Sequence, residues 1–241
     1  TLKRGQAYLF TDNGLDVLLN LDLFVLGLFV TAWDLGVYAE AAVIVRFFLI
    51  VPSGLKPILR RRYNIMAAAG HIADLNARVR RMTTALFSLH ALAALVVLLA
   101  FPAVLNFFFA TRGEEMLSFK LFAVFVPGLL FYSAFYAQEP LYEAAGQIAR
   151  LRRLTMITSG ANLALTFYLV PLAGHYGAAT ATMLTMLLYC LLFGRNLAAP
   201  PGIDKPTYAI AGLAVYLVYT FFEGWRPGEA AGVWLAPVIL A

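Results

Sequence analysis

The sequence predicts an all-α fold, a polytopic membrane helical bundle of about eight transmembrane helices. Hydrophobic residues make up 62% of the 241 residues and charged residues only 13%, whereas soluble domains carry about 25% charged residues. The hydrophobic residues gather in long runs, and the short loops between the runs alternate in charge. A water-soluble fold of this size cannot hide so much apolar surface from water.

The apolar runs define the expected helices and divide the chain into two regions. Each run is long enough, or nearly so, to cross a hydrocarbon layer about 30 Å thick as a helix. We expect residues 1–197 to form one transmembrane bundle of six helices, and residues 198–241 to form two trailing transmembrane helices. The chain starts at Thr1 and its last run stops at Ala241, so we expect a piece of a longer protein. The runs cover residues 9–31, 37–55, 83–109, 116–137, 154–171, 176–194, 207–222 and 230–241.

The loops between these runs alternate between basic and neutral or acidic. The positive-inside rule places basic loops in the cytoplasm. The alternation therefore predicts a multi-pass protein of the cytoplasmic (inner) membrane, with the N-terminus of the chain in the cytoplasm. The basic loops hold Lys3 and Arg4; Lys56, Arg60, Arg61, Arg62, Arg78, Arg80 and Arg81; Arg150, Arg152 and Arg153; and Arg195 and Lys205. The loops between them hold Asp34; Arg112, Glu114 and Glu115; His175; and Glu223, Arg226 and Glu229.

Composition and motifs argue against several classes of function. The net charge of +5 does not indicate nucleic-acid binding, because the basic residues lie where membrane topology alone puts them. The single cysteine, Cys190, lies inside an apolar run, so we expect a packing residue and no disulfide or thiolate metal site. The sequence lacks the common hydrolase, zinc-protease and nucleotide-binding motifs. We therefore expect no enzyme activity, no metal and no cofactor.

A short internal repeat marks two of the basic loops. The segment Ala68-Ala69-Gly70-His71-Ile72-Ala73 recurs at residues 144–149 with Gln147 in place of the histidine, and arginines follow each copy. Duplicated helix pairs are common in transporters. The repeat therefore supports a repeat architecture, with both copies at cytoplasmic helix ends.

Several polar residues lie inside the first two predicted membrane helices, where ionisable groups are costly and usually face a cavity or a partner. Asp12, Asp16 and Asn20 share one face of the first helix, whereas Asp22 lies on another flank near mid-depth, as does Arg46 in the second helix. One reading is a polar cavity in which Arg46 binds an anionic group such as a phosphate. Asp22 or Asp16 would then be its resting partner, or a cation or proton site. The other reading is a fixed ion pair, Asp22 with Arg46, that holds two helices in register.

Two further groups of polar residues have alternative readings. Glu139 and Glu143 share one face of a helix bent by Pro140, where they either receive a cation and gate the cytoplasmic mouth or pair with the arginines at 150–153; we favour the pairing. Asn162 lies alone at mid-depth in its helix. We favour a hydrogen bond to a neighbouring helix for Asn162 over contact with a substrate.

Three segments resemble the polysaccharide-export flippases of the multidrug/oligosaccharidyl-lipid/polysaccharide exporter superfamily. The segment from Asn162 to Thr182 (NLALTFYLVPLAGHYGAATAT) is similar to one family pattern. The segment LDLFVLG at 21–27, followed by LGVY at 35–38, is similar to the start of that family's second lobe. The third is the Ala-Ala-Gly that precedes basic residues after a kinked helix. Together they span about residues 15–195.

The resemblance implies the second lobe of a two-lobe exporter with a central cavity that opens alternately to each side of the membrane. Members of the family flip undecaprenyl-diphosphate-linked oligosaccharides for cell-surface polysaccharide, such as lipopolysaccharide. The implied partners are the lipid-linked substrate, membrane lipids, the missing N-terminal lobe, a polysaccharide polymerase and glycosyltransferases. The expected substrate-binding residues are Arg46, Asp22, Asp16, Asn20 and Asn162, and the expected gating or ion-coupling residues are Glu139 and Glu143.

Other functions stay open at this point. A cation-coupled multidrug antiporter of the same superfamily would carry mainly acidic residues in its cavity, and Arg46 argues mildly against it. A membrane glycan polymerase or ligase would carry a large external loop, and every predicted external loop is short. The last alternative is an assembly subunit without transport activity.

Overall fold

The computed structural model describes residues 14–109, 115–136 and 138–195. Every element in these ranges is an α-helix, which confirms the predicted all-α fold. Asp12 and both predicted trailing helices lie outside the described residues. The elements are α2 (Gly14–Phe29), α3 (Ala32–Ala68), α4 (Ile72–Phe109), α5 (Glu115–Tyr136), α6 (Glu139–Ala144) and α7 (Ile148–Arg195).

Four helical segments in the described part of the chain are long and apolar enough to cross a membrane, namely Ala32–Ala68, Asp74–Leu98, Leu117–Ala144 and Ile148–Phe193. The apolar part of α2, Asn20–Phe29, is shorter. The 37 residues of α3 correspond to about 55 Å of helix at about 1.5 Å per residue. That length exceeds the hydrocarbon thickness of about 30 Å, so α3 is longer than a membrane crossing requires.

The predicted loop over 56–81 is wrong, because α3 and α4 continue as helices through most of it and the chain reverses only near Gly70. Arginine and lysine are good helix formers, and the polar ends of long helices are stable outside the hydrocarbon. The loss of hydropathy after residue 55 marks where the apolar part of α3 ends. It does not mark where the helix ends.

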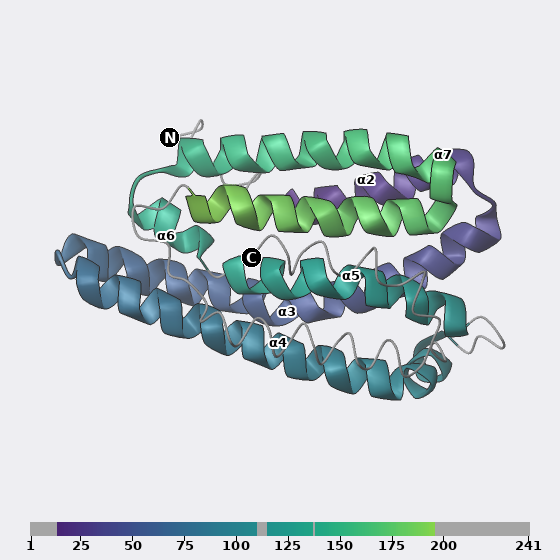
Figure 1. Cartoon of the computed structure of the whole chain (residues 1–241). Helices are drawn as coiled ribbons and strands as arrows, with labels where there is room; N and C mark the ends of the chain where they lie inside the picture. The colour runs from purple at the N-terminus through teal and green to yellow at the C-terminus, as the bar shows by residue number, and fades with distance from the viewer. Residues whose placement is uncertain (1–13, 110–114, 137, 196–241) are drawn as a thin grey trace.

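The predicted helices 154–171 and 176–194 are the two arms of α7. Gly174 interrupts the helix with φ 56° and ψ −132°, three residues after Pro171. Figure 1 shows the two arms running antiparallel, with the reversal at one end of the bundle. The arms touch near this turn, because a Cβ on Gly177 would lie 2.2 Å from the carbonyl oxygen of Leu169.

Helix α5 lies at the centre of the bundle, between the α3–α4 pair and the α7 hairpin (Figure 1). Its side chains are buried on most of its surface, including Phe122, Phe125 and Leu129, each 0% exposed. Gly128 provides the closest approach to α7, where an added Cβ would lie 2.9 Å from the carbonyl oxygen of Met183. The core therefore depends on a helix with apolar residues around its whole circumference and one small residue at the helix crossing.

The internal repeat forms the same turn twice. Gly70 and Gly146 have φ of 76° and 71°. The amides of His71 and Gln147, one residue further on, bond back five residues, to Met66 and Tyr142, at 3.1 and 2.8 Å. This is a Schellman helix end, which favours glycine in the left-handed position. Figure 1 places both turns at the same end of the bundle, as the shared basic charge predicts.

Candidate functional site: a buried carboxylate and two polar clusters

Asp22 on α2 is completely buried, and three hydroxyl groups surround its carboxylate. Tyr38 on α3 donates to Oδ2 at 3.2 Å. Thr166, on the first arm of α7, donates to Oδ1 at 3.1 Å, and Thr182, on the second arm, donates to Oδ2. One carboxylate therefore joins α2, α3 and both arms of α7.

The two threonine hydroxyl groups beside Asp22 also have backbone acceptors. The Thr166 hydroxyl lies 2.8 Å from the carbonyl oxygen of Asn162, and the Thr182 hydroxyl lies 3.2 Å from that of Ala178. A threonine hydroxyl has one hydrogen and two lone pairs. When that hydrogen serves the backbone, the hydroxyl oxygen turns a lone pair toward the carboxylate. Such an arrangement of oxygen atoms suits a bound cation, or a proton on the carboxyl group.

Asn162 belongs to the same cluster. Its side chain is 0% exposed and interacts electrostatically with Asp22, but neither atom of its amide group has a hydrogen-bond partner of normal geometry. The amide therefore lies beside a residue of a neighbouring helix, α2, and the expected hydrogen bond from Asn162 to that helix stays a prediction. A buried amide without a partner is costly, so the polar side chains of Asp22 and Asn162 are buried together in one cluster.

The second of the two readings, a fixed ion pair between Asp22 and Arg46, is wrong. The contacts of Asp22 are hydroxyl groups, and no described lysine or arginine forms an ion pair with it. Arg46 on α3 instead donates from Nη2 to Oδ1 of Asn20 on α2, at 2.9 Å. Asn20 is exposed and Arg46 is partly exposed, so this pair lies at the surface of the described bundle. Asp16 lies within α2, and its side chain is outside the described part.

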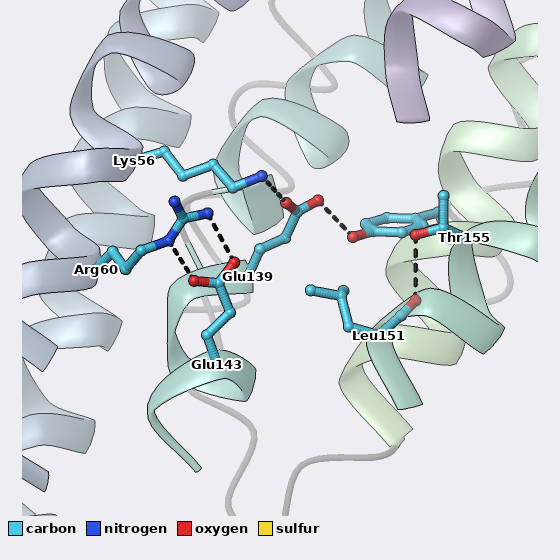
Figure 2. A network of polar contacts seen from close by, with 7 residues as sticks. Lys56, Arg60, Glu139, Glu143, Leu151 and Thr155 are labelled. Carbon is cyan, nitrogen blue, oxygen red and sulfur yellow. Dashed lines mark hydrogen bonds and ion pairs between the residues drawn. The ribbon is translucent and has the colours of Figure 1, made fainter. Parts of the chain in front are cut away.

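Glu139 is the centre of a second polar cluster, drawn in Figure 2. Its Oε2 lies 2.6 Å from Nζ of Lys56, and its Oε1 accepts a hydrogen bond of 2.6 Å from the hydroxyl of Tyr189. Lys56 also lies over the ring of Tyr136, with Nζ 4.7 Å from the ring centroid. The side chains of Lys56 and Glu139 are only 5% and 4% exposed.

Glu143 makes the second ion pair of this cluster, with Arg60. Arg60 donates through Nε to Oε2 and through Nη2 to Oε1, the latter at 2.9 Å, so the contact has two points (Figure 2). The preferred expectation, that these glutamates pair with the arginines at 150–153, is wrong. Their partners lie on α3, because α6 packs against the basic half of that helix.

Exposed arginines gather around these two pairs at the same end of the bundle, next to the Gly70 and Gly146 turns (Figure 1). At the other end, near the Gly174 turn, His175 lies 3.4 Å from Asp34. The described helices therefore have one strongly basic end. The exposed arginines there are Arg61, Arg62, Arg78, Arg80, Arg81, Arg150, Arg152 and Arg153.

Sequence reasoning missed several residues of these clusters. Thr166 and Thr182 lie within the segment that resembles the flippases, but a hydroxyl group gives no charge signal. Lys56 and Arg60 were counted only as loop charges, although their spacing of four equals that of Glu139 and Glu143. That equal spacing was the one available signal, because residues four apart share a helix face.

The described residues contain no group of three or more histidine, cysteine or acidic side chains placed to hold a metal ion. The Asp22 cluster offers a different kind of ligand set, with one carboxylate and three hydroxyl oxygens.

The fold and composition define an all-helical protein with helices long and apolar enough to cross a membrane. Comparison of the chain with models of known protein families, with curated proteins and with solved structures finds no match.

Proposed function

We propose that this chain is the second lobe of a flippase that moves lipid-linked oligosaccharide or polysaccharide precursors across the cytoplasmic membrane by alternating access. The Arg46–Asn20 pair carries the proposal. A charged side chain at mid-depth of a membrane helix is retained where it faces a polar chamber or a ligand. Arg46 is partly exposed and its described contact is a neutral amide, so its charge stays available to an anion.

Arginine suits the diphosphate of such a lipid carrier. Its planar guanidinium presents several donors in a fork and binds phosphate oxygens at two points. The contact with Asn20 uses one donor of Nη2 and holds the side chain against α2. Asn20 is exposed and Arg46 is partly exposed, so a second lobe packed against this side of α2 and α3 would complete a chamber around the guanidinium. The sugar headgroup would cross in that chamber while the lipid tail stays in the bilayer.

The Asp22 cluster would couple this cycle to a cation or proton gradient. A buried carboxylate without a cationic partner is costly unless it is protonated or binds a cation. Because its ligands come from α2, α3 and both arms of α7, occupancy of the cluster changes how tightly these segments are held together. Coupling requires such a link between ion binding and helix arrangement.

The basic end would face the cytoplasm, with α2 beginning there. The positive-inside rule favours this orientation, and both Schellman turns and their arginines lie at that end. The substrate would therefore be loaded at the basic end, after cytoplasmic glycosyltransferases have assembled it. A polysaccharide polymerase would take over the product on the opposite side.

Export of surface polysaccharide by cells that produce the full-length protein tests the role of Arg46. Arg46→Lys keeps a charge and should retain part of the export, whereas Arg46→Ala should abolish it at unchanged protein level. Arg152→Ala, at an exposed arginine of the basic end, is the matched control and should export normally. Equal export by all three variants would remove Arg46 from the substrate site.

The Asp22 cluster also favours a second candidate, a cation-coupled multidrug antiporter of the same superfamily. Such a protein needs a buried carboxylate to exchange a cation for its cargo, and Arg46 would have no anionic ligand. Resistance of cells to cationic drugs separates the two. The antiporter requires that Asp22→Asn abolish resistance and that Arg46→Ala leave it intact.

A further inference from the structure

Two ion pairs join α3 to α6 as a ladder. Lys56 and Arg60 are four residues apart on α3, and Glu139 and Glu143 are four residues apart on α6. The Lys56–Glu139 and Arg60–Glu143 pairs therefore lie one turn apart along both elements. Figure 2 shows the cations projecting from one helix toward the carboxylates of the other. We refer to these four residues as the charge ladder.

The charge ladder reaches the α7 hairpin as well. Glu139 accepts the hydrogen bond of Tyr189, on the second arm of α7, and the Tyr136 ring of α5 lies beneath Lys56. The carboxyl groups are almost completely enclosed, whereas the Arg60 side chain is 27% exposed. One cluster thus holds four segments together at the basic end of the bundle.

Buried ion pairs contribute little to net stability, because the desolvation of two charges offsets their attraction. Removal of one partner is nevertheless strongly unfavourable, since it strands the other charge. A half-formed pair that leaves one buried charge without its partner is therefore unfavourable, so the two charges are either in contact or both exposed to water. Two such distinct states are what a conformational switch requires. An apolar contact of the same size would loosen gradually.

The elements that the ladder joins are interrupted by prolines. Pro52 and Pro57 both lie inside α3. Pro52 precedes Lys56 by one helical turn, and Pro57 follows it directly. Helix α6 has six residues, carries Pro140 in its first turn and ends at the Gly146 turn. Pro52 and Pro57 each remove a backbone hydrogen bond within α3, whereas Pro140 lies in the first turn of α6, where no such bond is lost. The two ion pairs join α6 directly to this proline-interrupted part of α3.

We propose that the charge ladder is a conformational latch that holds the basic end of the lobe closed, and that it opens as a unit when α6 separates from α3. The closed latch keeps Tyr189 and its neighbours packed and dry. Opening the latch admits water along the second arm of α7. In the proposed flippase this would be the end at which the substrate enters, but the latch itself is tested without transport.

The single cysteine of the chain provides the reporter. Cys190 is 6% exposed and follows Tyr189 directly. Its rate of reaction with N-ethylmaleimide, measured on the peptide that contains Cys190, should be low in the full-length protein in membranes. Glu143→Gln should raise that rate about tenfold, which corresponds to about 1.4 kcal/mol. If Glu143→Gln accumulates poorly, Arg60→Lys, which keeps the charge and loses the two-point contact, should raise the rate by a smaller factor.

Two controls separate a latch from general loosening. The charge exchange Arg60→Glu with Glu143→Arg restores the pair and should return the labelling rate of Cys190 to that of the wild type. The second control places a reporter at the other end, with Ser118→Cys in a Cys190→Ser background; Ser118 is 0% exposed on α5. Its labelling should not respond to Glu143→Gln.

Three results would overturn the proposal: an unchanged Cys190 rate in Glu143→Gln, an equal increase at both reporter positions, or no recovery in the exchanged pair. Substrate flipping is a separate measurement on the same proteins. If the wild type flips no lipid-linked sugar, the flippase proposal fails, while the labelling results still decide the latch.

Discussion

His90 on α4 lies with Nε2 2.7 Å from the carbonyl oxygen of Phe48 on α3. That carbonyl lacks its usual helical partner, because the residue four positions later is Pro52, which has no amide hydrogen. The other ring nitrogen, Nδ1, lies 2.7 Å from the carbonyl oxygen of Leu86. In the tautomer that carries its hydrogen on Nε2, the imidazole supplies the missing donor to Phe48 across the helix pair. His90 is therefore a buried packing residue whose ring also meets the carbonyl group that the proline leaves without its helical donor.

This contact predicts a difference between two substitutions of His90. His90→Leu keeps the apolar contacts and leaves the Phe48 carbonyl unpaired at a buried site, which should destabilise the protein by about 1–3 kcal/mol. His90→Gln retains a donor and should lose less. Thermal unfolding of the full-length protein in detergent measures both. A His90→Leu variant as stable as His90→Gln would show that this hydrogen bond is unimportant.

Gly128→Ala should weaken the packing of α5 against α7. The added methyl group would lie 2.9 Å from the backbone oxygen of Met183, so the helices must move apart, at a cost of about 1–3 kcal/mol. Gly160→Ala is the matched control, because open space surrounds that position within its helix. The melting temperature of Gly128→Ala should fall and that of Gly160→Ala should not. The opposite order would contradict the described crossing.

The two Schellman turns make a prediction about additivity. Gly70→Ala and Gly146→Ala each force a side chain into the left-handed backbone region, at a cost of about 1–2 kcal/mol. Neither position is crowded, so backbone strain is the only penalty. Because the turns share no hydrogen bonds, the losses in the double variant should add. Melting temperatures of the two single variants and the double variant provide the check, and full stability of either single variant would count against its turn.

The Asp22 cluster predicts a response to bound cations or protons. If it binds an ion in the folded state, the ion stabilises that state by mass action, by about 2.7 kcal/mol at a hundred times its dissociation constant. Wild-type melting temperature should therefore rise with sodium at constant ionic strength, or change with pH if the ligand is a proton. Asp22→Asn should abolish the response, and Thr182→Val should weaken it. An Asp22→Asn variant that responds like the wild type in both series would exclude the site.

The all-helical fold could be predicted from the sequence because membrane solvation acts on each helix separately. Twenty apolar residues identify a crossing whatever the helix packs against. The same reasoning misplaced the ends of α3 and α4. Hydropathy shows where the apolar part of a helix ends, but the helix itself continues through polar residues that also favour helix. The repeat at Gly70 and Gly146 was recognised in the sequence. The structure explains it, because both copies form the same hydrogen-bonded turn.

The contacts within the site could not be predicted from the sequence, because they join residues that are far apart along the chain. The Thr166 and Thr182 partners of Asp22 lie 144 and 160 residues away, and Glu143 lies 83 residues from Arg60. Charge and estimated depth suggested Arg46 as the partner of Asp22. The orientation of α2 about its axis rules out that contact, because Asn20 faces Arg46 on α3 and Asp22 faces Thr166 on α7.

Flipping of a fluorescent undecaprenyl-diphosphate-linked oligosaccharide by the full-length protein in proteoliposomes tests the central claim most directly. Wild-type protein should move the labelled lipid from the outer leaflet to the interior, where a membrane-impermeant quencher cannot reach it. Arg46→Ala should match protein-free vesicles, and Arg152→Ala should match the wild type. A wild-type protein that flips no more than empty vesicles, or an Arg46→Ala variant that flips at the wild-type rate, would contradict the account.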